Sequence, residues 1–147
     1  MFVVGCLELL PGSKEPMEKA FKKLLRSSVG ADKSKLVFTE TEWLYCFEEA
    51  QKQSIAGVLF PVVKENLLDE NGGRIEPLFN EWLGLIVQTD CSNRNLNEKA
   101  KSLTRIFKSW DFQTCILKGQ GVATLYPEPS LRQSGDIDIW VSGKRPF

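Results

Sequence analysis

A single helical pattern runs from Pro77 to about Trp110, with no proline after its first residue. Apolar residues recur along it at helical spacing, and we interpret them as core packing rather than as the lining of a ligand pocket. At a rise of 1.5 Å per residue, an unbroken helix here would be roughly 50 Å long. The polar stretch QTDCSNRN, residues 88–95, could instead divide it into two helices.

Two shorter helices are expected earlier in the chain. Pro16 suits the first position of a helix, because its missing N–H would have no intrahelical partner there. Apolar residues from Met17 to Leu25 then recur at spacings of three and four. Thr39, with Glu42 three residues later, has the form of a capping box and predicts a second helix to about residue 53.

Residues 54–69 also have a helical pattern, although Pro61 lies inside it. Proline removes a backbone hydrogen bond and clashes with the preceding turn, so the helix is either kinked or begins anew at Pro61. The tract DENGGR predicts a mobile turn over residues 69–74. Helices therefore fill the first three quarters of the chain.

The charges and the absence of histidine exclude several kinds of function. The chain has 19 basic and 19 acidic residues and a pI near 6.3, so no overall field favours nucleic acid or an anionic membrane. Without histidine there is no Ser-His-Asp triad, HExxH zinc protease or Cys2His2 finger. We interpret the lysine-rich side of residues 19–26 as a solvated helix face.

The cysteines point to a reducing compartment. Cys6, Cys46, Cys91 and Cys115 form no CxxC pair, which argues against a metal cluster or a redox dithiol. Three of them stand in apolar or helical contexts, where a buried thiol acts as a small hydrophobe. The first ten residues lack the features of a signal peptide, and no window is apolar enough to span a bilayer. We expect a cytoplasmic protein with reduced cysteines.

The character of the sequence changes after residue 112. A short apolar run at residues 114–117 and the stretch DIDIWV at residues 136–141 have the length of strands rather than helices. In an extended strand Asp136, Asp138 and Trp140 share one side, and the intervening apolar residues share the core side. Two carboxylates on one side of a strand can converge on one or two divalent cations, although an exposed edge strand with two solvated acids would look the same.

Upstream stands LKGQG, residues 117–121, at the end of the first predicted strand. Glycine lets backbone N–H groups approach a phosphate closely, and Lys118 supplies a positive charge. Arg132, four residues before Asp136, is a candidate phosphate contact. Each of these features also has an ordinary structural explanation, as a strand exit and a loop arginine.

Residues 116–141 together resemble the nucleotidyltransferase superfamily that includes DNA polymerase β. They are most similar to a branch of uncharacterised bacterial nucleotidyltransferases with LKG, a Tyr-Pro segment, an arginine and a Gly-Asp-hydrophobic-Asp strand. In that branch a helical region with a conspicuous tryptophan helix precedes the motif, as Trp43 and Trp82 do here.

The resemblance implies a function for each of these positions. Asp136 and Asp138 would be catalytic and would bind Mg²⁺ or Mn²⁺. Lys118, Gly119, Gln120 and Arg132 would contact the nucleotide or its phosphates. The implied reaction transfers a nucleoside monophosphate from an NTP to an unknown hydroxyl or phosphate acceptor, releasing pyrophosphate.

Two departures from the family pattern bear on activity. Gln120 stands where the superfamily usually has serine or glycine, and residues 139–147 contain no acid that could be the third carboxylate. Two strands also cannot complete the sheet. We therefore expect a truncated, N-terminal portion of an enzyme that is inactive alone.

The expected fold is α+β and mostly α. A helical region, residues 1–112, would pack on the first strands of a nucleotidyltransferase-type mixed sheet, residues 113–147. Two other functions stay open: a non-catalytic helical interaction module with a degenerate motif, and a sugar-nucleotide glycosyltransferase, which is disfavoured because the apolar residues follow the acids. An open sheet edge would favour a homo-oligomer.

Overall fold

The computed structural model describes residues 14–67 and 75–143. This part of the chain is mostly helical and includes one two-stranded antiparallel sheet, which confirms a mainly α protein with a small β component. The elements in order are α1 (Lys14–Ser28), α2 (Glu40–Lys52), α3 (Ala56–Asn66), α4 (Glu76–Ser109), β1 (Gln113–Ile116), α5 (Gln120–Ala123), the 3-10 helix η1 (Pro129–Leu131) and β2 (Ile139–Ser142).

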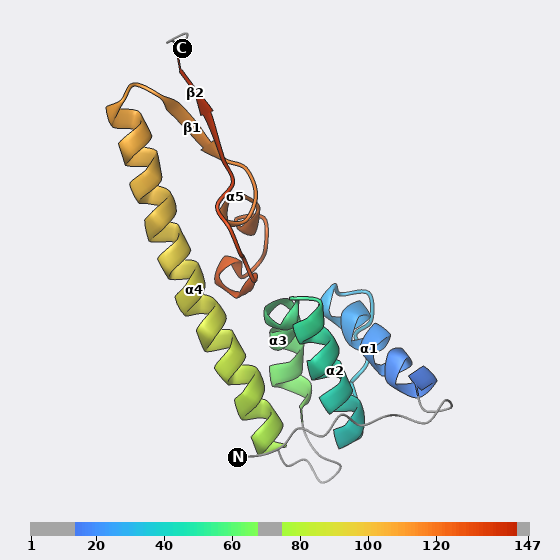
Figure 1. Ribbon diagram of the computed structural model, residues 1–147. Coiled ribbons are helices and arrows are strands. Elements are labelled where there is room, and N and C mark those ends of the chain that lie inside the picture. The colour runs from blue at the N-terminus through green and yellow to red at the C-terminus, as the bar shows by residue number, and fades with distance from the viewer. Residues whose placement is uncertain (1–13, 68–74, 144–147) are drawn as a thin grey trace.

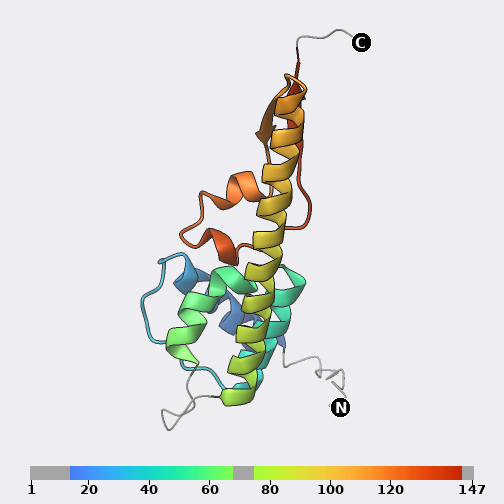
Figure 2. The same ribbon diagram turned by 90° about the vertical axis from the view of Figure 1, so that its left-hand side faces the viewer.

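Helix α4 organises the whole molecule. Figure 1 shows α1, α2 and α3 gathered at one end of α4 and the two strands at its other end, with α5 between them. The view from the side shows the same order along α4 (Figure 2). Strand β1 packs on α4, which thus connects the helical bundle to the sheet. None of the helices in the described part is long and apolar enough to cross a membrane.

The 34 residues of α4 form one helix, so the polar stretch at residues 88–95 does not divide it. Nothing in this stretch is a proline or glycine that would break the helix. Instead Thr89 and Asn93 are buried there, and the Thr89 hydroxyl donates to the carbonyl of Leu85. The polar residues mark a place where α4 contacts other polar groups.

The core of the bundle is aromatic, as the helical spacing predicts. Trp43 of α2 and Trp82 of α4 are both fully buried. Trp43 packs against Phe38 with ring centroids 4.8 Å apart, and Trp82 packs against Phe47 at 5.0 Å. Such tilted pairs add to the stabilisation from burial of the rings, by about 0.5–1.5 kcal/mol each.

The predicted capping box is found in the structure, but neither of the prolines considered as helix starts is the first residue of its helix. The Thr39–Glu42 capping box is present, with the Thr39 N–H donating to the Glu42 carboxylate at 2.8 Å. Pro16 lies in the first turn of α1, which begins at Lys14. Pro61 does not start a helix, because it lies in the middle of α3. The proline is on the exposed side of that helix. The turn expected at residues 69–74 lies outside the described residues.

The cysteines differ from one another in environment. Cys46 is buried in α2, and burial raises the pKa of its thiol to about 12. Cys91 and Cys115 are exposed, so the burial expected for three of the four cysteines is wrong for at least one of them. All three described cysteines are free thiols.

The two strands pair in the register Thr114 with Val141, Cys115 with Trp140 and Ile116 with Ile139. The pairing is antiparallel, and larger mixed-sheet packing remains a prediction. Strand β2 is shorter than expected and begins at Ile139, after both aspartates. The Leu117 N–H nevertheless donates to the Asp138 carbonyl at 2.9 Å, so strand-like hydrogen bonding reaches the second aspartate. The proposed domain boundary falls in the turn between α4 and β1, and the division into two domains also remains a prediction.

Candidate active site

The glycine loop, residues 117–121 after β1, directly contacts the aspartate segment, residues 136–138. Gly119 has a φ of 55° and a ψ of −108°, a conformation that L side chains rarely adopt. A Cβ at this position would lie 2.8 Å from the carbonyl oxygen of Asp136. Both the backbone conformation and the close approach therefore require glycine. This contact places the glycine loop beside the aspartate segment, although the two are far apart in the sequence.

The two aspartates stand just before strand β2 and differ in burial. Asp136 is exposed, whereas Asp138 is half-buried, as are Ile137 and Ile139 on either side of it. The burial of these residues therefore does not show the alternation predicted from the sequence, and both aspartates precede the strand proper. Trp140, which follows on the same side, is 52% exposed.

Lys118 lies beside one of these aspartates. Its Nζ is 3.7 Å from Oδ2 of Asp138, and the two side chains are 78% and 37% exposed. Such a solvated pair is worth less than about 1 kcal/mol. Lys118 can therefore leave the carboxylate at little cost when a metal ion or a phosphate arrives.

Arg132 holds the glycine loop from the other side. Its guanidinium donates to the Gly119 carbonyl at 3.2 Å and to the Ser134 hydroxyl at 2.9 Å. The same group lies 5.7 Å from the centre of the Tyr126 ring. Two hydrogen bonds use only part of the five N–H donors of an arginine, so the remaining donors are available to an anion.

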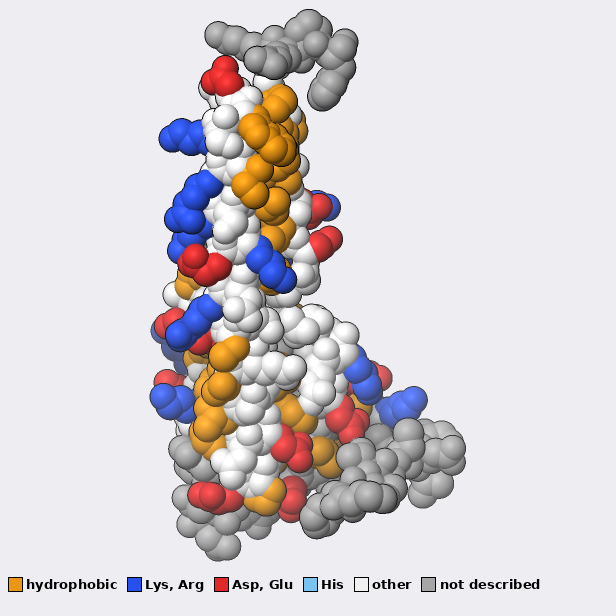
Figure 3. All heavy atoms as spheres, turned by 60° about the vertical axis from the view of Figure 1, so that its left-hand side comes forward, with side chains coloured by type: hydrophobic (Ala, Val, Ile, Leu, Met, Phe, Trp, Pro, Cys, Tyr) orange, Lys and Arg blue, Asp and Glu red, His pale blue; other side chains and the backbone are white. Residues whose placement is uncertain are grey.

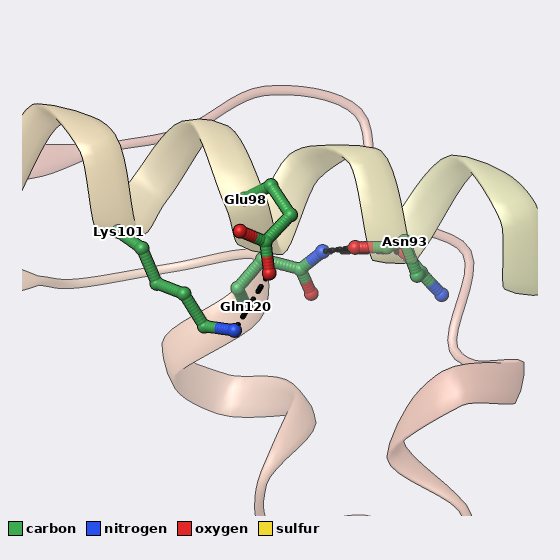
Figure 4. Close-up of polar contacts among 4 residues, drawn as sticks. All are labelled: Asn93, Glu98, Lys101 and Gln120. Atoms are coloured by element: carbon green, nitrogen blue, oxygen red, sulfur yellow. Dashed lines mark hydrogen bonds and ion pairs between the residues drawn. The ribbon is translucent and has the colours of Figure 1, made fainter.

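Gln120 points toward α4. Its side-chain amide donates to the backbone carbonyl of Asn93 at 3.2 Å, as Figure 4 shows. Its oxygen is 3.5 Å from the Ser134 hydroxyl. Gln120, which stands where the superfamily usually has serine or glycine, thus links the glycine loop to α4. Its hydrogen bonds are made to Asn93 and Ser134 of the same chain.

Asn93 is a residue that the sequence analysis did not identify. Its side chain is buried, with 2% of its surface exposed. The amide donates to the carbonyls of Ser130 and Arg132, both at 2.7 Å. A polar stretch inside a helical pattern can mark a helix break. A polar side chain that is buried in an amphipathic helix can equally anchor a loop, as Asn93 does.

The structure therefore brings all six predicted positions together. Gly119 touches Asp136, Lys118 pairs with Asp138, and Arg132 and Gln120 both meet Ser134. Asn93 connects this set to the middle of α4.

The two aspartates offer oxygen ligands of the kind that Mg²⁺ prefers, and Mg²⁺ often keeps water or substrate phosphates in its other positions. The donor set fits Mg²⁺ or Mn²⁺ on these chemical grounds. Among the described residues no group of three or more His, Cys, Asp or Glu side chains could hold a metal ion. A complete three-carboxylate site is thus not formed within this part of the chain.

A model of the family described as "Uncharacterised nucleotidyltransferase" matches residues 39–145. The chain belongs to this nucleotidyltransferase family. The matched range starts at the cap of α2 and includes all six candidate residues. The relation to nucleotidyltransferases therefore includes α2, α3 and α4 and extends well beyond the motif at residues 116–141. Comparison with curated proteins and with solved structures gives no match.

Proposed function

We propose that this chain provides the metal-binding and nucleotide-binding part of an enzyme that transfers a nucleoside monophosphate from an NTP to an acceptor. The observation that supports this most strongly is the contact between Gly119 and the Asp136 carbonyl, which sets a phosphate-binding loop beside two carboxylates. Membership of the nucleotidyltransferase family agrees with this chemistry.

In this proposal the exposed Asp136 and the half-buried Asp138 bind Mg²⁺ or Mn²⁺ through their carboxylates. The bound metal supplies charge stabilisation to the transferred phosphoryl group and to the leaving pyrophosphate. The backbone at Gly119 approaches the triphosphate, and Lys118 exchanges Asp138 for a phosphate oxygen. Arg132 keeps the loop in place through the Gly119 carbonyl and directs its remaining donors to the phosphates.

The transfer step forms a bond between the acceptor oxygen and the α-phosphorus. The bond from this phosphorus to the bridging oxygen breaks, and pyrophosphate leaves with that electron pair. A hydroxyl acceptor also releases its proton to water. The chain holds the substrate and orients the phosphates, which is the main contribution of a protein to this kind of reaction.

We propose that the chain alone binds nucleotide but transfers it poorly. The resemblance implies three carboxylates, and only two are present in the aspartate segment. A third carboxylate would complete the metal site.

The free thiols of the described cysteines agree with a reducing bacterial cytoplasm as the setting for such an enzyme.

A calorimetric titration of the chain with MgATP and with each of the other three Mg–NTPs tests the proposal. We expect metal-dependent binding of at least one NTP, weakened tenfold or more by Asp136→Asn or Asp138→Asn. Asp111→Asn is the matched control, because Asp111 is an exposed acid with a φ of 63°, a conformation that asparagine also adopts. If no NTP binds, or if the aspartate variants bind as the parent does, the non-catalytic interaction module becomes the better explanation.

A further inference from the structure

A groove runs between α4 and the segment that contains α5 and η1. Its larger part has a volume of about 400 Å³ and lies between α4, Ile116 of β1, and Gln120 and Gly121 of α5. A second part of about 300 Å³ continues past Ser130. Asn97 and Gln120 line both parts, so the two form one continuous depression.

Two cations and no acid line this groove. Lys101 and Arg105 lie one turn apart on α4 and line its larger part. No Asp or Glu is among the described residues that line either part. Lys101 pairs with Glu98 at 2.7 Å, but these side chains are 59% and 67% exposed, so the pair is weak and can exchange. Within the part of the chain that the structure describes, Arg105 forms no ion pair.

The two cations belong to a longer basic stripe on α4. Arg94, Lys101, Arg105 and Lys108 are seven, four and three residues apart, which places them on one side of a helix. Figure 3 shows Lys and Arg side chains following one edge of the upper half of the molecule. Asp90 and Glu98 lie on the same side of α4 and pair with Arg94 and Lys101. The excess of positive charge in the stripe therefore comes from Arg105 and Lys108, although the whole chain has no net charge.

The rest of the lining suits a ligand that is more than a simple anion. Ala100 and Ile116 supply apolar surface inside the groove, and Asn97, Thr104 and Gln120 supply amide and hydroxyl groups. A phosphate ester matches this combination. Its phosphate would bind the two cations, and its carbon skeleton and hydroxyl groups would contact the apolar and polar side chains.

The groove also reaches the candidate active site. Gln120 lines the groove and directly follows Gly119, which contacts the Asp136 carbonyl. A ligand in the groove would therefore end beside the loop that faces the two aspartates. We propose that the α4–α5 groove binds a phosphate ester, and that this ester is the acceptor of the nucleotidyl group. The second statement rests on the proposed function; the first does not.

Binding of ribose 5-phosphate to the full chain in EDTA tests the first statement. We expect chemical-shift changes of Gln120, Gly121 and Thr104 in ¹⁵N-resolved NMR spectra, and weaker changes with inorganic phosphate. Arg105→Gln and Lys101→Gln should each weaken binding about fivefold or more. Lys99→Gln removes the same charge about 200° around the helix from Lys101 and should change binding less than twofold. Absence of shifts in the groove residues, or equal binding by Arg105→Gln and the parent, would overturn the assignment.

A second titration separates the acceptor from the nucleotide. With MgATP at saturation, ribose 5-phosphate should still bind the groove with an affinity within threefold of that without nucleotide. Mutual exclusion would overturn the acceptor assignment, because the groove would then hold the phosphates of the NTP. Asp136→Asn should weaken MgATP binding tenfold or more while leaving ribose 5-phosphate bound, so failure of the proposed function and failure of the groove proposal give different results.

Discussion

Single residues determine how the candidate site is assembled. Gly119 permits the glycine loop to approach the Asp136 carbonyl, and Asn93 connects the loop at residues 130–132 to α4. Neither side chain is expected to perform chemistry. Both act through geometry, because they set where the side chains of Asp136 and Arg132 lie.

Gly119→Ala should weaken nucleotide binding more than any exposed glycine substitution. The new Cβ would meet the Asp136 carbonyl at 2.8 Å on a backbone with positive φ, which strains the loop by about 1–3 kcal/mol. Urea unfolding and MgATP titration measure the two effects. Gly135→Ala is the control, since a Cβ there meets no atom within 4 Å. Equal nucleotide affinities of the two variants would contradict this role of Gly119.

Asn93→Ala should lower the free energy of unfolding by about 1–3 kcal/mol, because two carbonyls lose their donor in a buried place. Chemical denaturation measures this loss. Asn95→Ala, on an exposed position of the same helix, should change stability by less than about 0.5 kcal/mol. A small effect of Asn93→Ala would mean that the loop is held by other contacts.

Helix α4 is the element on which the site depends. It runs without a break from the aromatic core at Trp82 to the strands, and its buried polar face carries the loop that precedes the aspartates. The strands alone would be marginal, because an isolated hairpin has little stability in water. The hairpin therefore depends for its stability on the packing of β1 against a folded α4.

Two glycine-to-alanine substitutions within helices should change stability in opposite directions. Gly84 lies on the exposed side of α4 with nothing within 4 Å of an added Cβ, so Gly84→Ala should stabilise by about 0.5–1 kcal/mol. Gly57 of α3 packs against η1, and a Cβ there would overlap the Leu131 carbonyl at 1.8 Å. Gly57→Ala should destabilise the fold by about 1–3 kcal/mol. Thermal unfolding of both variants measures the difference, and the same sign for both would contradict this packing.

The hydrophobic core of the molecule lies at one end of α4, and the hairpin lies at the other end, outside this core (Figure 1). The hairpin end carries exposed apolar side chains, including Leu117 and Trp140, both 52% exposed. Each strand also has one edge without a partner strand among the described residues. Open edges and exposed apolar side chains favour association with further β structure.

Self-association should therefore depend on the open face of the hairpin. We expect the weight-average mass from light scattering to rise with concentration, and Trp140→Lys to suppress the rise. Leu125→Lys is the control, because Leu125 is 82% exposed but lies outside the strands. A parent chain that stays monomeric at high concentration, or equal effects of the two variants, would rule out this surface.

Local sequence rules predicted much of this protein. The capping box at Thr39 and the helical faces with Trp43 and Trp82 are set by neighbours within a few residues. Spacing alone could not decide whether α3 and α4 were broken, because helix continuity at Pro61 and at residues 88–95 depends on what each turn packs against.

The sequence by itself determined the helical content, the two short strands and the identity of the two candidate metal ligands. Only the tertiary structure decided that Lys118 lies beside Asp138, that Gln120 turns to α4, and that Asn93 anchors the site. The reason is physical. Helix and strand patterns follow from interactions between residues close in the chain, whereas these contacts join residues 20 or more positions apart. They form only when α4 packs on the loops or, for Lys118 and Asp138, when β1 pairs with β2.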